Sequence, residues 1–273
     1  MDISVKQKLE NIATKVRIGI IEGVFNAKSG HPGGSLSIAD VLTVLYFDVM
    51  NIDPKDPKKE NRDRLVVSKG HAGPVVYATL AHRGYFEEDE LLTLNKIGTN
   101  LPSHCDMNKV IGVDMTTGSL GQGISCAVGI ALGSKIKKDN AYIYSIIGDG
   151  ESQEGQVWEA MMFAANKKLD NLIAFLDYNH LQIDGTVEEV NDCGSMEDRF
   201  ASFGWDTYSI DGHNIELIKE TIEKAKLVKG KPHMIILNTL KGKGVSFIEM
   251  VPDKNHSMPI TNEDLEKALE ELK

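Results

Sequence analysis

Residues 142–181 read YIYSIIGDGESQEGQVWEAMMFAANKKLDNLIAFLDYNHL, and this stretch decides the fold. Two almost continuously apolar runs, at 142–147 and 172–176, flank a segment from about 152 to 168 whose apolar residues recur at helical spacing. Continuous apolar runs are typical of strands that are buried on both faces, and a helix between two such strands predicts a parallel βαβ unit.

The same alternation extends toward the C-terminus. Apolar runs at 205–210 and 233–237 lie on either side of a helical pattern at 214–226. Strands that alternate with helices predict an α/β fold with a mostly parallel sheet and helices on both faces. We expect residues 1–273 to form a single domain of this kind, because no repeat, low-complexity tract or Gly/Ser linker divides the chain.

Three further helices are expected outside this alternation. The first covers 5–26 and ends near Ser29 and Gly30, where glycine suits a helix end. The second covers 38–50, and the segment DPKDPKKENRD behind it is predicted to be an exposed polar loop. The last covers 261–273, is amphipathic and begins with a Thr or Asn cap.

The composition excludes several classes of protein. Hydrophobic residues make up 41% and charged residues 26% of the chain, as in ordinary soluble globular proteins. A formal net charge of −10 gives no general attraction to nucleic acid or anionic lipid, so neither is expected as a partner. The longest weakly polar stretch, 124–133, is far shorter than the ~20 residues of a membrane span, and the N-terminus lacks the apolar core of a signal peptide.

The three cysteines, Cys105, Cys126 and Cys193, are far apart in the sequence. They lack the close pairing of zinc and redox motifs, which predicts small buried residues rather than ligands or disulfides. Free thiols fit a reducing compartment, so a cytoplasmic location is expected.

Polar residues follow both apolar runs of the opening stretch. Asp149 lies in the sequence GDG after the first run, and Asn179 follows the second run about thirty residues later. The carboxyl ends of parallel strands meet at one edge of a sheet, so these two side chains are expected to converge. Their oxygens suit Mg²⁺, with the glycines and the next helix facing a diphosphate. The alternative is that GDG is only a turn and Asn179 only caps a loop.

Further segments narrow this prediction. Together with the opening stretch, KSGHPGGSLS (28–37), SKGHAGPVVYATL (68–80), TTGSLGQGIS (116–125) and TLKGKGV (239–245) resemble the transketolase family, in the family's order. The resemblance extends from near the N-terminus to about residue 260 and implies the thiamine diphosphate-binding fold of that family, its diphosphate-binding half.

The resemblance implies a cofactor site with thiamine diphosphate and a divalent ion. The Mg²⁺ ligands are Asp149, Asn179 and the main-chain carbonyl of Leu181, and the sequence does not distinguish Mg²⁺ from Ca²⁺ or Mn²⁺. The residues implied around the diphosphate are Gly150, Lys69, His71, Lys241 and His256. His256 is followed by Ser257, where the family usually has glycine. Taken alone, Lys69 and Lys241 would be interpreted as solvated surface lysines.

The resemblance also implies residues at the reacting centre. His31 and His104, with His71 and His256, are expected to bind substrate hydroxyls and to transfer protons, which imidazole can do near neutral pH. A histidine in a Gly-rich loop can instead cap the backbone.

Two more sets come from the same resemblance. Gly118, Ser119 and Leu120 are expected against the cofactor rings. Glu154, also assigned to cofactor binding, and Glu159 are expected at a dimer interface that links two active sites. The alternative for the glycine-rich loop is that it only allows tight helix packing. The alternative for the two glutamates is that they lie on a solvated helix face.

The resemblance finally implies a partner and a reaction. In the family, the glutamate that activates the cofactor belongs to a pyrimidine-binding domain that follows this one, so we expect a separate C-terminal subunit, assembly as a homodimer of heterodimers, and no activity of the chain alone. The implied reaction transfers a two-carbon ketol unit from a ketose, usually a phosphate, to an aldose. The alternatives are a specialised transketolase for an unusual sugar, a deoxyxylulose-phosphate synthase-like enzyme, and a non-catalytic cofactor-binding interaction protein.

Overall fold

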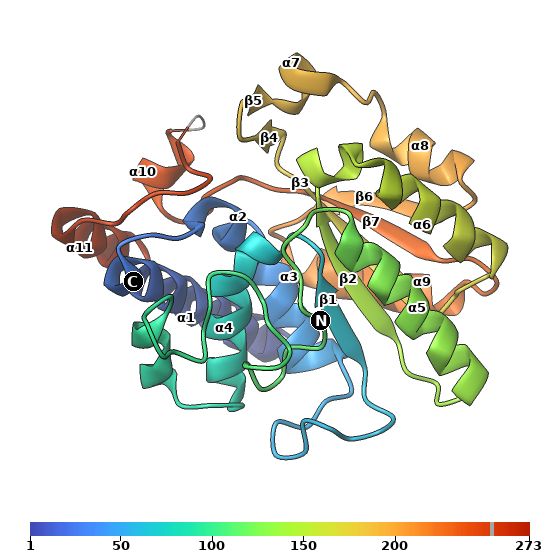
Figure 1. The fold of residues 1–273 in the computed structure, drawn as a ribbon, viewed down its shortest axis with the longest axis horizontal. Coiled ribbons are helices and arrows are strands. Elements are labelled where there is room, and N and C mark those ends of the chain that lie inside the picture. The colour runs from blue at the N-terminus through green and yellow to red at the C-terminus, as the bar shows by residue number, and fades with distance from the viewer. Residues whose placement is uncertain (252–253) are drawn as a thin grey trace.

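The computed structural model describes residues 1–251 and 254–273. Within them, five parallel strands form one sheet in the order β1-β2-β3-β7-β6. Figure 1 shows this sheet in the middle of the molecule with helices on both sides, which confirms the predicted α/β architecture. The strands are β1 (Arg64–Val67), β2 (Ile143–Gly148), β3 (Leu172–Tyr178), β6 (Asp206–Asp211) and β7 (His233–Asn238).

Two hydrophobic clusters lie on the two faces of the sheet. Along β3, Ile173 and Phe175 belong to one cluster while Leu172, Ala174 and Leu176 belong to the other. Successive side chains of a strand point to opposite faces, so a strand between two helical layers must be apolar at every position. All five side chains are fully buried, and each large one stabilises the fold by about 1.5–3 kcal/mol.

The helices divide between the two faces. The first face carries α1 (Ile3–Ala27), α3 (Ala39–Val44), α4 (Gly73–Arg83) and α9 (Ile215–Leu227). The second carries α5 (Gln122–Lys137), α6 (Gly155–Asn166) and α8 (Met196–Ser202).

Shorter elements surround this framework. They are α2 (Pro32–Leu36), α7 (Val187–Asn191), α10 (Ser246–Glu249), α11 (Asn262–Glu271), the hairpin β4 (Leu181–Gln182) and β5 (Gly185–Thr186), and the 3₁₀ or π turns Leu45–Val49, Gly70–Ala72, Glu88–Thr93 and Gly150–Gln153.

The predicted helices are present, with one correction to the first. α1 ends at Ala27, and the left-handed residue that ends it is Lys28 (φ 55°), not a glycine. Gly30 instead allows close packing, since a Cβ there would lie 2.9 Å from a methyl of Val24. The last helix is capped by Thr261, whose side chain accepts a hydrogen bond from the Asp264 amide.

The sequence prediction missed β1, α4 and α8. The apolar pattern indicates 142–147 as the first strand, but β1 precedes it and pairs with β2 from Arg64 opposite Ile143 to Val67 opposite Ile146. β1 has only four residues, which is too few for its pattern to stand out. Its position matters because the SKGH segment follows it directly, at the same edge of the sheet as GDG.

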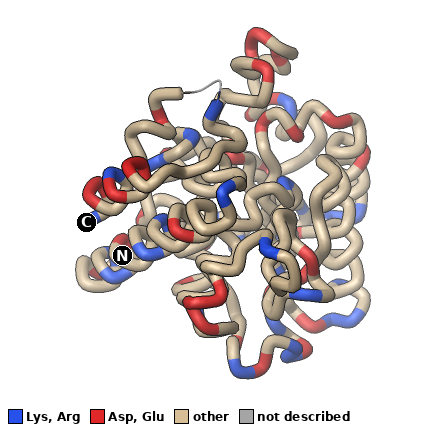
Figure 2. The backbone as a smooth tube through the Cα atoms, turned by 60° about the vertical axis from the view of Figure 1, so that its left-hand side comes forward, with Lys and Arg blue, Asp and Glu red and all other residues tan. Residues whose placement is uncertain are grey.

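The surface agrees with the composition. In the view of Figure 2, acidic and basic residues are interspersed over the outer helices and loops. Across the described ranges no helix has the length and apolar character needed to cross a membrane. Cys105 and Cys193 are buried and Cys126 is partly buried, and all three are free thiols.

Candidate active site

The carboxyl ends of β2 and β3 bring Asp149 and Asn179 together. Gly148 and Asp177 are the last residues that pair between β2 and β3. Asp149 Oδ1 accepts a hydrogen bond from the main-chain amide of Gly150 (2.8 Å), and its Oδ2 accepts one from the main-chain amide of Asn179 (3.0 Å). Both residues therefore lie at one point of the sheet edge, as expected from the order of the motifs.

A sharp turn aims the third expected ligand at the same point. His180 adopts a left-handed conformation (φ 62°), and Asn179 Oδ1 accepts a hydrogen bond from the Leu181 amide at 3.2 Å. The Leu181 carbonyl accepts from Lys241 Nζ at 3.4 Å. Gly150 faces the start of this hairpin, where a Cβ would lie 3.0 Å from Gln182 Cβ.

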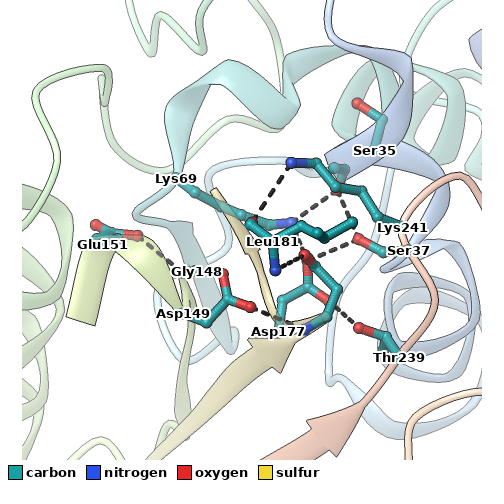
Figure 3. A network of polar contacts seen from close by, with 12 residues as sticks. Ser35, Ser37, Lys69, Gly148, Asp149, Glu151, Asp177, Leu181, Thr239 and Lys241 are labelled. Carbon is teal, nitrogen blue, oxygen red and sulfur yellow. Dashed lines mark hydrogen bonds and ion pairs between the residues drawn. The ribbon is translucent and has the colours of Figure 1, made fainter. Parts of the chain in front are cut away.

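Asp177, which the sequence analysis did not assign, organises the floor of the site (Figure 3). Its Oδ2 accepts from Lys69 Nζ (2.6 Å), Ser37 Oγ (2.6 Å) and Asn179 Nδ2 (2.9 Å), and its Oδ1 accepts from Thr239 Oγ1 (2.5 Å). Asp177 is fully buried and Lys69 is 2% exposed. The only sequence signal was an acid directly after an apolar run.

The two neighbouring carboxylates are shifted in opposite directions. Burial disfavours the charged form of Asp177, but the Lys69 ammonium and the hydroxyls of Ser37 and Thr239 hold its pKa below the usual range. Burial, and then repulsion from Asp177, raises the pKa of Asp149 to about 6. The protein around Asp149 therefore compensates its negative charge only in part, which is expected for a carboxylate that binds a cation.

Glu151 is a second residue that the sequence analysis did not assign. Its carboxylate accepts from Ser68 Oγ and from the amides of Gly121 (2.9 Å) and Gly148 (3.0 Å). These bonds tie the loop 116–123 to the end of β2. Burial raises the pKa of Glu151, and the hydrogen bonds offset this rise only in part. A charged residue two positions after Asp149 was the available signal.

Four histidines gather beside the sheet edge. The His31 ring centroid is 5.4 Å from that of His71, 5.7 Å from His104 and 5.3 Å from His256, and the His71 and His256 centroids are 4.8 Å apart. They come from four separate segments, so the structure unites all four residues expected at the reacting centre. Nδ1 of His31 is buried without a hydrogen-bond partner among the described residues.

This cluster favours neutral imidazoles. Burial, followed by Lys69 and the other histidines, lowers the pKa of His71 well below its ordinary value. Burial and then His104 lower the pKa of His31, and burial and then Lys241 lower that of His256 to about 4. Neutral imidazole offers both a donor and an acceptor, which suits the recognition of hydroxyl groups.

Backbone contacts hold the His31 segment in place. The Gly33 amide donates to the Asn255 carbonyl (3.1 Å), and the Gly242 amide donates to the Gly33 carbonyl (3.1 Å). A Cβ on Gly33 would lie 2.2 Å from the Asn255 carbonyl oxygen, so only glycine fits there.

The remaining expected residues are less closely grouped. Leu120 lines the cavity, and a Cβ on Gly118 would lie 3.5 Å from the His104 ring. Ser119, Glu154 and Glu159 are exposed, and none of them lines the cavity.

The cavity at this edge has a volume of about 240 Å³. Its lining includes most of the expected cofactor-binding residues, but not Gly118, Ser119 or Glu154, and it includes the hairpin that follows β3. The lining residues are Gly34, Lys69, His71, Leu120, Gly148, Asp149, Gly150, Glu151, Gln153, Asp177, Asn179, Leu181, Gln182, Ile183, Asp184, Lys241 and His256.

The donors at this point fit a hard divalent cation bound together with a phosphate group. Asp149, the Asn179 side chain and the Leu181 carbonyl supply one charged and two neutral oxygens, which is the donor type that Mg²⁺ prefers. In residues 1–251 and 254–273 no group of three or more His, Cys, Asp and Glu residues could hold a metal by itself. Ligand and water oxygens would therefore have to complete the coordination.

The fold and the cavity define an open parallel α/β domain that binds its ligand at the carboxyl ends of the strands. The family described as "Transketolase, thiamine diphosphate binding domain" matches residues 8–272. This chain belongs to the transketolase family, as its thiamine diphosphate-binding domain, and the expected resemblance is confirmed.

Two of the relatives are named as transketolase subunits. The 6-deoxy-6-sulfo-D-fructose transketolase subunit SqwG of Clostridium sp. (strain MSTE9) is 53% identical over 264 residues, covering 97% of this chain and 96% of the relative. An apulose-4-phosphate transketolase subunit of Phocaeicola vulgatus is 42% identical over 266 residues, covering 97% of this chain and 94% of the relative.

Solved structures agree with the fold. Transketolase from Campylobacter jejuni superposes with a TM-score of 0.90 at 35% identity, covering 100% of this chain and 43% of that chain. Transketolase from Leishmania mexicana superposes with a TM-score of 0.90 at 31% identity, covering 97% of this chain and 41% of that chain. The chain therefore spans less than half the length of these solved transketolases.

Proposed function

We propose that this chain is the thiamine diphosphate-binding subunit of a two-subunit transketolase. Together with a pyrimidine-binding subunit, it transfers a two-carbon ketol unit from a ketose to an aldose. The observation that carries the proposal is the convergence of Asp149, Asn179 and the Leu181 carbonyl on one cavity edge, with Lys241 Nζ 3.4 Å from that carbonyl.

The metal is held by the oxygens at this edge. Asp149, Asn179 and the Leu181 carbonyl bind Mg²⁺, and the pKa of about 6 at Asp149 supports this role because a bound cation would offset its buried charge. Gly150 and the 3₁₀ turn behind it line the same cavity and face the diphosphate.

Basic residues neutralise the rest of the diphosphate charge. Lys241 is 3% exposed and His71 and His256 line the same cavity, so their donors are desolvated and strong. Lys69 gives two of its three N–H groups to Asp177 and the Gly34 carbonyl (2.7 Å), which leaves one for a phosphate oxygen. Lys69 is therefore a fixed donor and not a free surface cation.

The four clustered histidines bind the sugar. When bound, thiamine diphosphate supplies the carbon nucleophile that carries the two-carbon unit. His31, His71, His104 and His256 orient the hydroxyl groups of the sugar and exchange protons with them. The lowered pKa values of His31, His71 and His256 favour neutral rings at pH 7, each able to donate at one nitrogen and accept at the other.

A second polypeptide completes the enzyme. Both relatives named above are subunits by name, and this chain covers nearly all of each. The partner contributes the pyrimidine-binding half with its activating glutamate, and the assembly is a homodimer of heterodimers. Glu154, the N-cap residue of α6, and Glu159 within α6 are exposed in this chain and lie at the dimer interface of that assembly.

The donor is a ketose with an anionic group at its far end. The 53% identity to a 6-deoxy-6-sulfo-D-fructose transketolase subunit supports a sulfonated ketose over a phosphorylated one. We assign much of the contact with the phosphate of the acceptor sugar to the partner, so the complete assembly is needed to compare sugars.

The first test is calorimetric titration of thiamine diphosphate into the chain, with and without Mg²⁺. Mg²⁺-dependent binding is expected, and its absence would contradict the cofactor assignment. The second test adds the partner and compares 6-deoxy-6-sulfo-D-fructose, fructose 6-phosphate and xylulose 5-phosphate as donors. Cofactor binding without turnover of any ketose would favour a non-catalytic binding protein.

A further inference from the structure

A line of polar contacts runs from α1, where it is buried, to the loop after β7, where it is exposed, and it lies outside the cavity. Arg17 donates to both carboxylate oxygens of Asp40 (3.1 and 2.6 Å), and His213 Nδ1 lies 2.9 Å from Asp40 Oδ2. On its other side, His213 Nε2 accepts a hydrogen bond from the Leu240 amide at 2.9 Å. The line thus ends one residue before Lys241.

The geometry fixes the tautomer of His213. The Leu240 N–H is a donor, so Nε2 must be the unprotonated acceptor. A neutral imidazole then carries its proton on Nδ1, which donates to the Asp40 carboxylate. Asp40 and Arg17 therefore hold the ring in the one form that can receive the Leu240 amide.

The three side chains of this line are largely buried. Arg17 is 8% exposed, Asp40 is 5% exposed, and the His213 side chain is 16% exposed. Taking an ion pair out of water costs free energy that its attraction seldom recovers, so net stability is a poor explanation for keeping one. A specific geometry that the pair imposes on its neighbours is a better explanation.

The neighbour is the segment that carries Lys241. Arg17 Nε donates to the Lys243 carbonyl (3.2 Å), so the same guanidinium also holds the far side of this segment. The Gly242 amide donates to the Gly33 carbonyl (3.1 Å), which joins the segment to the His31 loop. Lys241 is 3% exposed, and its Nζ reaches the cavity edge beside the Leu181 carbonyl.

We propose that His213 is a positioning residue for the cofactor site: held by Asp40 and Arg17, it anchors the Leu240 amide and so fixes the backbone from which Lys241 reaches the diphosphate. The effect on the cofactor rests on the proposed function, since it assumes that Lys241 binds the diphosphate. The effect on the backbone does not. His213 itself touches neither substrate nor cofactor.

Two variants separate the two halves of the contact. In His213→Gln the side-chain oxygen extends to the position of Nε2 and can still accept the Leu240 amide. In His213→Asn the side-chain amide reaches only the position of Nδ1, so it keeps the bond to Asp40 and leaves the Leu240 amide unpaired. A residue that only fills space would make the two variants alike.

The first measurement is hydrogen exchange of the Leu240 amide in the full chain without cofactor. We expect exchange about tenfold faster in His213→Asn and within about twofold of wild type in His213→Gln, as the loss of one net hydrogen bond implies. The second measurement is the Kd for thiamine diphosphate in Mg²⁺, which we expect to rise about tenfold in His213→Asn only.

The outcomes are distinguishable. Unchanged exchange and Kd in His213→Asn, or equal losses in both variants with equal falls in Tm, would overturn the positioning role. A wild-type chain that binds no thiamine diphosphate would contradict the proposed function instead, and the exchange measurement would still decide whether His213 anchors the loop.

Discussion

Two ion pairs at opposite ends of the same sheet differ in how far they are buried. At the carboxyl ends, Lys69 and Asp177 form an ion pair whose side chains are 2% and 0% exposed. At the amino ends, the Lys135–Asp170 pair joins the helix α5 to the turn before β3, with side chains 35% and 21% exposed. Both pairs lie at ends of the same apolar strands, so the difference in burial between the pairs does not come from the hydrophobic core. For these two pairs, the difference indicates that the Lys69–Asp177 pair is kept buried for binding, at a cost to stability.

The largest expected effect is the loss of the buried counter-charge. Asp177→Ala should lower the free energy of unfolding by about 3–5 kcal/mol, because Lys69 would stay buried without its partner. Chemical denaturation measures this. The double variant Lys69→Met/Asp177→Leu should recover most of the loss, and a single variant as stable as wild type would mean that Lys69 is not dependent on Asp177.

The next effect concerns the cofactor. Asp149→Ala should raise the Kd for thiamine diphosphate in Mg²⁺ at least about 100-fold, the upper end of what losing even an outer partner of a metal site costs. Asp170→Ala is the matched control, since it removes an aspartate from the opposite end of the sheet. Equal Kd values for the two variants, by calorimetry, would refute the metal assignment.

The sequence predicted the strands that carry Asp149 and Asn179 better than the network of polar contacts beneath them. Continuous apolar runs and the GDG turn have local signatures, so the meeting of Asp149 and Asn179 could be expected. The roles of Asp177 and Glu151 could not, because their partners, such as Ser37, Ser68 and Gly121, are distant in the sequence. Lys69 and the four histidines were found through the family motifs, not through any local pattern.

A smaller effect should appear with pH. The pKa of His256 is lowered to about 4 by burial and Lys241, so between pH 6.5 and 4 the unfolded chain binds more protons than the folded chain. Its contribution to stability is complete above pH 6.5 and is lost as the pH falls through 4, by roughly 1 kcal/mol after allowance for partial exposure. Unfolding at pH 7 and pH 5 should show a smaller drop in His256→Asn than in wild type.

The smallest effect belongs to the amino end. Lys135→Ala breaks an exposed pair and should lower the free energy of unfolding by less than about 1 kcal/mol, with less loss in high salt. Cofactor affinity should not change. A loss as large as that of Asp177→Ala would abolish the contrast between the two ends of the sheet.

The two backbone hydrogen bonds that hold Gly33 have a consequence for when the protein can bind its ligand. The two backbone partners, Gly242 and Asn255, are translated long after Gly33 itself. A nascent chain on the ribosome can pair β1, β2 and β3 early, but it cannot close the pocket until residue 255 has left the exit tunnel. Capture of the vitamin-derived ligand therefore requires three segments that are distant in the sequence to come together first, and contacts of such long sequence separation form slowly.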